Sequence, residues 1–143
     1  MPTILLAIDG SEHALRAAQT LVQNAAWYRE APRVHALYVH LPVPDVHGLH
    51  RVVGKQAMQR YYREEGEAGL APCRKLLERA GIPFDAEVAV GPVAETIVAR
   101  AKKARCDMIY MGTRGMTAVT NMLLGSVATK VLHLSSIPVV LVR

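Results

Sequence analysis

The sequence of 143 residues has little cysteine, few aromatic residues and no long apolar run, and each shortage excludes a class of protein. Its two cysteines, Cys73 and Cys106, form no Cys-x-x-Cys pair, so neither a zinc site nor a thiol redox motif is indicated. Aromatic residues make up only 5% of the chain, which leaves Leu, Val, Ile, Ala and Met to build the core. No apolar stretch approaches the roughly 20 residues that a membrane-spanning helix needs. Because the first residues also lack a basic leader, we expect a cytoplasmic protein with no membrane partner.

Motifs of the common hydrolytic enzymes are absent as well. The sequence contains neither the Gly-x-x-x-x-Gly-Lys-Ser/Thr loop of the P-loop NTPases nor a Gly-x-Ser-x-Gly nucleophile elbow. The net charge of +5 admits nucleic acid as a partner. However, the cations are scattered, and most stand among Glu residues or near helix C-termini, where the backbone dipole favours them. We interpret the charge as a solvated surface that attracts anions, and we do not expect nucleic acid to be the main partner.

Short apolar runs alternate with segments of helical periodicity along the chain, and the length suits a single domain over residues 1–143. The expected strands cover residues 3–8, 34–39, 84–90, 108–111 and 137–142. Helices are expected before Pro32 and over residues 55–80, 93–101 and 126–134, with a break or kink in the second near Gly66, Gly69 and Pro72. We interpret residues 46–53 as a mobile loop.

This alternation predicts an α/β fold with an open five-stranded parallel sheet and helices on both faces. In such a sheet a ligand binds outside the carboxyl ends of the strands, where the strand order reverses. The residues expected at those ends are Asp9, Val39, Gly91 and Gly112.

The loop after the fourth strand carries the most informative pattern, which is Gly112-Thr113-Arg114-Gly115, nine further residues, and then Gly125-Ser126. Glycines can adopt positive φ and let a phosphate approach backbone N–H groups closely. Gly125 and Ser126 open the last expected helix, whose unpaired N–H groups and dipole favour an anion. Arg114 can add a charge-assisted contact to phosphate oxygens. The loop is therefore a candidate phosphate site.

The spacing Gly-x2-Gly-x9-Gly-Ser resembles the ATP-binding motif of the universal stress protein family. The likeness extends to the opening Ile8-Asp9-Gly10-Ser11, to residues 107–112 and to the closing residues 137–142. The resemblance implies a Rossmann-like sheet of the adenine nucleotide α-hydrolase type, in the order 3-2-1-4-5. It implies ATP as the ligand, with AMP or ADP as alternatives and Mg²⁺ or Mn²⁺ on the phosphates. It also implies a homodimer formed through the C-terminal strand, residues 138–143.

The resemblance further implies which residues form the site. Ala7 and Asp9 would line the adenosine end, with Asp9 near the ribose or bound to the metal, and Val39 would contact adenine through its backbone. The ribose and phosphates would be surrounded by Met111, Gly112, Arg114, Gly115, Gly125, Ser126 and Val127. One departure is Ala128, where ATP-binding relatives often carry a hydroxyl. The loss of one hydrogen bond there weakens binding by about 0.5–1.5 kcal/mol.

Structural explanations compete with some of these roles. Asp9 or Ser11 can cap the first helix, Ser126 can cap the last one, and Arg114 can be a surface cation. His40, His47 and His50 lie with Asp45 in one expected loop, where a transition-metal site is an alternative, although we favour solvated side chains. The sequence shows no evident partner for His13, His35 or His133.

Taken together, the residues predict a nucleotide-dependent sensor or switch in the stress response. No catalytic residue is assigned, because phosphoryl transfer needs charge stabilisation and a positioned nucleophile, and no general base is evident. A slow ATPase or an autophosphorylating protein, using Thr113, Thr117 or Ser126, is the first alternative. The second is a dimeric interaction module without a nucleotide, or a nucleic-acid binder whose affinity would fall steeply with salt.

Overall fold

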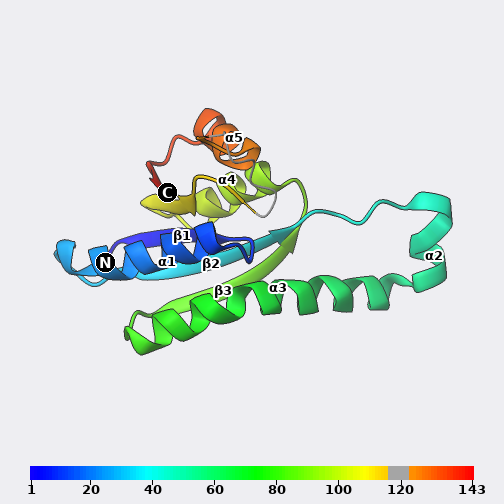
Figure 1. Ribbon diagram of the computed structural model, residues 1–143, viewed down its shortest axis with the longest axis horizontal. Helices are drawn as coiled ribbons and strands as arrows, with labels where there is room; N and C mark the ends of the chain where they lie inside the picture. Colours follow the sequence, from blue (N-terminus) through cyan, green and yellow to red (C-terminus); the bar gives the residue numbers. More distant parts are fainter. Residues whose placement is uncertain (116–122) are drawn as a thin grey trace.

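Five parallel strands form one sheet in the order β3-β2-β1-β4-β5 in the computed structural model, which describes residues 1–115 and 123–143 (Figure 1). The strands are β1 (Thr3–Ile8), β2 (Arg33–His40), β3 (Phe84–Val90), β4 (Met108–Gly112) and β5 (Val139–Val142). The predicted architecture and strand order are confirmed. The chain adds β2 and β3 on one side of β1 and then crosses over to β4 on the other. The strand order therefore reverses between β1 and β4, which is where a ligand is expected.

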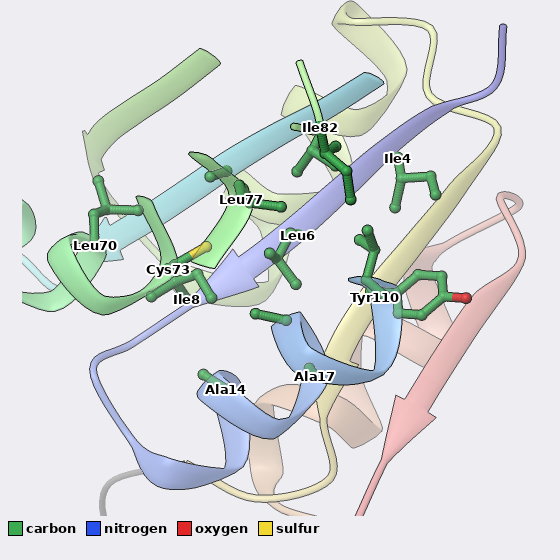
Figure 2. Close-up of a cluster of buried hydrophobic side chains, with 14 residues drawn as sticks. Ile4, Leu6, Ile8, Ala14, Ala17, Leu70, Cys73, Leu77, Ile82 and Tyr110 are labelled. Carbon is green, nitrogen blue, oxygen red and sulfur yellow. The ribbon is translucent and has the colours of Figure 1, made fainter. Parts of the chain in front are cut away.

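Helices cover both faces of the sheet because strand side chains alternate between the faces. The helices are α1 (Glu12–Asn24), α2 (Leu49–Val53), α3 (Lys55–Arg79), α4 (Val93–Lys103) and α5 (Ser126–Leu134). Ile4, Leu6 and Ile8 pack beneath α1 and α3 (Figure 2). Leu5 and Ala7 face the opposite way, beneath α4 and α5. Each fully buried Leu or Ile contributes about 1.5–3 kcal/mol, so β1 is anchored from both faces. Among the described residues, no helix is both long and apolar enough to cross a membrane.

The turn between β1 and α1 is fixed by a short chain of hydrogen bonds. Gly10 has φ +83°, which permits the sharp reversal after the strand. Ser11 is the N-cap, and its hydroxyl accepts a hydrogen bond from the Ala14 N–H at 3.2 Å. Asp9 Oδ1 in turn accepts hydrogen bonds from the Ser11 N–H at 2.9 Å and from the Ser11 hydroxyl at 2.5 Å. Of the two predicted caps Ser11 performs the capping, and Asp9 holds it in place.

Helix α3 runs through residues 55–79 as one continuous helix with Pro72 inside it, so the first of the two predicted alternatives, a break near its middle, is wrong. The two glycines serve close packing instead. A Cβ on Gly66 would lie 2.4 Å from Val88 Cγ2, and one on Gly69 would lie 2.4 Å from Tyr38 Cε2. Any side chain larger than hydrogen at these two positions would clash, so the glycines allow α3 to pack closely against β2 and β3.

The segment predicted as a mobile loop contains regular structure. After β2 the chain forms a short 3-10 helix, Val46–Gly48, and then α2. Both lie beyond the edge of the sheet, beside the first turns of α3 (Figure 1). The buried residues of α3 all lie in its second half, from Gly66 onward. We call residues 41–65 the arm, because they extend away from the sheet.

Candidate functional site

A cavity of about 580 Å³ lies at the carboxyl ends of β1, β2 and β4 and reaches the start of α5. This size is typical of small-molecule sites. The structure brings all ten predicted site residues to its wall, which are Ala7, Asp9, Val39, Met111, Gly112, Arg114, Gly115, Gly125, Ser126 and Val127. The wall also includes residues that the sequence reasoning did not assign, among them Leu37, Tyr38, His40, Leu41, Val93, Ile97 and Ala128. Gly91, expected at the end of the third strand, is not among the lining residues.

One end of the cavity is apolar and carries a backbone carbonyl that accepts no hydrogen bond from residues 1–115 or 123–143. Leu37 and Val39 from β2 face Val93 and Ile97 from α4 within one hydrophobic cluster. Pairing of β1 with β2 ends at Ile8 and Tyr38, one residue before Val39. Along β2 the backbone groups alternate between the two neighbouring strands, and those of Val39 face the β1 side. The Val39 carbonyl therefore lies where the β1 partner has ended, beside an apolar wall suited to a flat ring.

The other end is formed by the loop after β4 and the first turn of α5. The Gly125 N–H donates to the Thr113 carbonyl at 2.6 Å, which fixes the start of α5 against this loop. The N–H groups of the first helical turn have no partner within the helix. They open onto the cavity at Ser126, Val127 and Ala128. Together with the Arg114 guanidinium they form an end suited to an anion.

Gly112 and Gly115 are needed for space rather than for unusual backbone angles. None of Gly112, Gly115 and Gly125 has positive φ, contrary to one of the reasons proposed from the sequence. A Cβ on Gly112 would lie 2.9 Å from the His13 carbonyl oxygen, and one on Gly115 would lie 2.7 Å from Asp9 Oδ2. A Cβ on Gly125 would lie 3.4 Å from the Arg114 Cα. The loop is therefore folded tightly onto α1 and Asp9.

Asp9 links the two ends of the cavity. Its Oδ1 is held by Ser11, while its Oδ2 faces Gly115 at the anion end. No group of three or more His, Cys, Asp or Glu residues able to hold a metal occurs among residues 1–115 and 123–143. A single carboxylate fits Mg²⁺ only in company with phosphate oxygens and water, which is how this ion is often held. The residues present therefore fit a metal that arrives with a phosphate ligand.

Other sequence expectations near the site need correction. Ser126 is the first residue of α5, and the N-cap is Gly125, so the hydroxyl does not cap the helix. Thr117 lies outside the described residues. His40 lines the cavity, and its ring packs edge-on against Tyr62 with centroids 5.0 Å apart. His50 is not simply solvated, because its Nε2 donates to the Val43 carbonyl at 2.7 Å.

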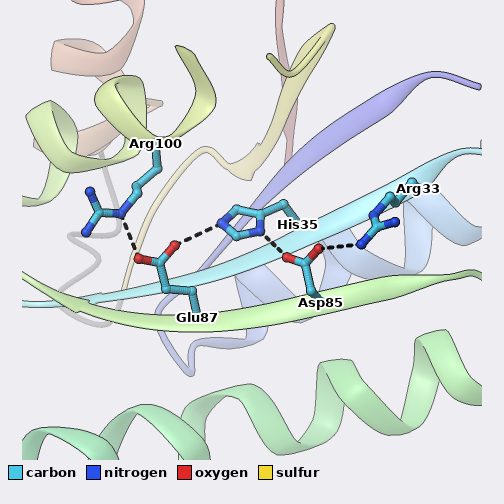
Figure 3. Close-up of polar contacts among 5 residues, drawn as sticks. All are labelled: Arg33, His35, Asp85, Glu87 and Arg100. Carbon is cyan, nitrogen blue, oxygen red and sulfur yellow. Dashed lines mark hydrogen bonds and ion pairs between the residues drawn. The ribbon is translucent and has the colours of Figure 1, made fainter. Parts of the chain in front are cut away.

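His35, for which the sequence showed no partner, belongs to an ion-pair network away from the cavity (Figure 3). Its Nδ1 contacts Asp85, and its Nε2 lies 3.0 Å from Glu87 Oε2. Arg33 and Arg100 close the two ends of the network, at 3.1 Å from Asp85 and 2.7 Å from Glu87. Burial raises the pKa of Asp85, but hydrogen bonds from His35 and Arg33 outweigh it, so the pKa is lowered. The network joins β2, β3 and α4 and has a structural role.

Comparison with known proteins assigns the chain to a family. A model of the universal stress protein family matches residues 1–143. The chain belongs to the universal stress protein family. Universal stress protein MJ0531 of Methanocaldococcus jannaschii is 34% identical over 140 residues, which cover 98% of this chain and 81% of that protein. A universal stress protein of Thermus aquaticus is 37% identical over 144 residues, which cover 99% of this chain and 98% of that protein.

Solved structures of the family share the fold. Protein MJ0577 of M. jannaschii superposes with a TM-score of 0.82 at 28% identity, covering 99% of this chain and 94% of that one. A universal stress protein in complex with cAMP gives a TM-score of 0.71 at 22% identity, covering 99% and 97%. The Archaeoglobus fulgidus protein in complex with dAMP gives 0.67 at 18% identity, covering 100% and 98%.

Proposed function

We propose that this universal stress protein binds ATP in the cavity at the carboxyl ends of its strands and acts as a nucleotide-dependent sensor or switch. The observation that carries the proposal is the cavity itself, with an apolar end, an anion-binding end and one carboxylate between them. Two solved structures with this fold hold cAMP and dAMP. At 22% and 18% identity they support the proposal only through the shared fold, so the residues of this chain carry the argument.

At the apolar end, adenine would lie between the side chains of β2 and those of α4. The Val39 carbonyl can accept a hydrogen bond from the exocyclic amine of adenine. Guanine presents an oxygen at the corresponding position, and two acceptors facing each other leave both unpaired. A buried polar group without a partner costs about 1–3 kcal/mol. We therefore expect ATP to bind about tenfold more tightly than GTP, or better.

At the opposite end, the phosphates would meet the first turn of α5 and the Arg114 guanidinium. Backbone N–H groups and a guanidinium both donate to phosphate oxygens, and the helix dipole adds a favourable field. Asp9 Oδ2 would complete the coordination of Mg²⁺ or Mn²⁺ bound to those phosphates. Without the cation, Asp9 and the phosphates repel each other, so we expect ATP affinity to fall when the metal is removed.

A nucleotide-dependent switch requires that bound ATP is not hydrolysed before the protein reaches binding equilibrium with the ATP in solution. Asp9 is the one Asp or Glu on the described cavity wall and would be engaged by the metal ion, and Arg114 is the only Arg or Lys on that wall. We accordingly expect hydrolysis that is slow or absent. The buried Thr113 on the wall favours one variant of this idea, autophosphorylation, which mass spectrometry after incubation with ATP would detect.

Isothermal titration with ATP, with and without magnesium, tests the proposal. Gly115→Val places a side chain in the space next to Asp9 Oδ2 and should abolish the heat of binding. Ala71→Val is the control, because it also introduces a valine, on an exposed position of α3 that does not line the cavity. Binding that survives Gly115→Val, or no binding of any adenine nucleotide to the wild type, contradicts the proposal.

We also propose that the protein is a homodimer formed through β5. This strand is at the edge of the sheet and pairs only with β4. The carbonyls of Pro138 and Val142 accept hydrogen bonds from Ile109 and Thr113 on the β4 side. By alternation the backbone groups of Val139 and Leu141 face outward. A second copy pairing there antiparallel would cover an edge that is otherwise open to aggregation.

A further inference from the structure

The outer part of the arm, residues 46–63, carries several positive charges and no negative one, although Asp45, Glu64 and Glu65 flank it. From Val46 to Arg63 the sequence holds four cations, Arg51, Lys55, Arg60 and Arg63, and no Asp or Glu. All four are exposed, and none forms an ion pair with a described residue. The interpretation of the charge as scattered and balanced by Glu therefore fails for this segment.

The arm also exposes apolar side chains that the fold does not use. Val52 is 82% exposed and Val46 is 56% exposed, and Leu49 and Val53 are exposed beside them. These residues belong to the 3-10 helix and to α2, which lie at the end of the arm farthest from the sheet (Figure 1). Valine and leucine in this setting gain nothing from the protein's own core.

The arm is tied to the sheet at its base, where the ring of His40 on β2 packs against Tyr61 and Tyr62. Gly54 interrupts the chain between α2 and α3 with φ +87°, and its N–H donates to the His50 carbonyl at 2.9 Å. At its base the Val43 N–H donates to the Tyr62 hydroxyl at 2.8 Å. Apolar and cationic side chains are thus presented together at the end of a formed projection.

We propose that the outer part of the arm, residues 46–63, is a docking surface for an anionic lipid membrane. Its run of unpaired cations matches anionic headgroups, and its exposed valines match the acyl boundary just below them. Side chains that project outward suit a deformable lipid surface better than they suit a rigid partner, which would need a groove. The expectation of no membrane partner came from the lack of a spanning run, and surface docking needs no such run. The proposal does not depend on nucleotide binding.

Vesicle co-sedimentation tests this proposal. The wild type should bind phosphatidylcholine vesicles that contain about one-third phosphatidylserine, bind pure phosphatidylcholine vesicles far less, and lose binding at high salt. Reversing two cations by Arg51→Glu with Lys55→Glu should weaken binding more than tenfold, since each cation near an anionic surface contributes about fivefold. The matched control reverses Lys102 and Lys103, which are exposed at the end of α4 and change the net charge equally.

A second pair of changes separates lipid from other anions. Val46→Ser with Val52→Ser keeps every charge and should weaken vesicle binding roughly tenfold, because these side chains would leave the acyl boundary. Equal loss in the arm variant and the control overturns the proposal, as does unchanged binding after the valine substitutions. If the arm variants alter the oligomeric state by light scattering while the wild type ignores vesicles, the arm joins copies of this chain and the proposal is wrong.

Discussion

Gly115 lies so close to Asp9 that the effect of Gly115→Ala on stability should depend on the side chain at position 9. The substitution should destabilise the wild type and stabilise an Asp9→Ala variant. A Cβ on Gly115 would lie 2.7 Å from Asp9 Oδ2, whereas ordinary contacts lie between 3.4 and 4 Å. The Asp9 carboxylate would have to rotate, and rotation breaks the hydrogen bonds that Oδ1 accepts from Ser11. Each such bond contributes about 0.5–1.5 kcal/mol net, so the clash costs about 1–2 kcal/mol.

Without the clash, Gly115→Ala should stabilise the protein. The φ of Gly115 is not positive, and alanine at a compatible position stabilises by about 0.4–1 kcal/mol through the unfolded state. Gly115→Ala should therefore lower the free energy of unfolding by roughly 1 kcal/mol in the wild type. In an Asp9→Ala background it should raise that free energy by about 0.4–1 kcal/mol.

Urea unfolding of the wild type, the Gly115→Ala and Asp9→Ala variants and the double variant measures the coupling free energy between the two positions. We expect it to be about 1–2 kcal/mol. Gly125→Ala supplies the control cycle, because its Cβ would contact Arg114 and Thr113 rather than Asp9. That cycle should be additive within about 0.5 kcal/mol. Additivity in the Gly115 cycle would refute the packing of the loop against Asp9.

Three other substitutions test the packing of α3, the His35 network and the sheet edge. Gly66→Ala should destabilise by about 1–3 kcal/mol through overpacking against Val88, and Val88→Ala should relieve most of that loss in thermal unfolding; a Gly66→Ala protein as stable as the wild type would contradict the close approach of α3. Asp85 has a lowered pKa in the folded state, so its contribution is present above the unfolded pKa of about 4 and is lost as the pH falls through the lower folded value. Asp85→Asn should therefore lower the free energy of unfolding at neutral pH, by less than about 1 kcal/mol because solvent screens the ion pairs of Asp85. At a pH below the folded pKa of Asp85, the same substitution should have a smaller effect. Leu141→Pro removes an outward N–H of β5 and should give a monomer by light scattering, whereas Leu141→Ala loses the same packing and should remain a dimer.

The strands could be predicted because buried parallel strands are continuous apolar runs, whereas their order followed only from the resemblance to the universal stress protein family. Thr3–Ile8 and Met108–Gly112 have no amphipathic alternative, and Asp9-Gly10 limits the end of the first of them. Asp9, Val39 and Gly112 could be located because carboxyl ends of neighbouring strands meet at one edge of the sheet, whereas Ala7, Met111 and Val127 followed only from the family resemblance.

Features that depend on contacts between distant segments could not be predicted from local sequence. Gly66 and Gly69 suggested a helix break, because glycine lowers helix propensity and nothing nearby in the sequence shows Val88 or Tyr38 beneath them. The partners of His35 lie 50 and 52 residues away, on a strand whose register with β2 the sequence does not specify. The apolar lining from α4, Val93 and Ile97, resembles an ordinary core stripe in sequence.

The most direct test of nucleotide binding is to map backbone amide chemical shifts of the protein during titration with ATP and magnesium. We predict saturable shifts at Ala7 to Asp9, at Val39 to Leu41, at Gly112 to Gly115 and at Ser126 to Ala128, which are four of the segments that line the cavity. We expect none at the His35 network, on the far part of β2. No saturable shifts, or shifts gathered away from these segments, would show that the cavity is not a nucleotide site.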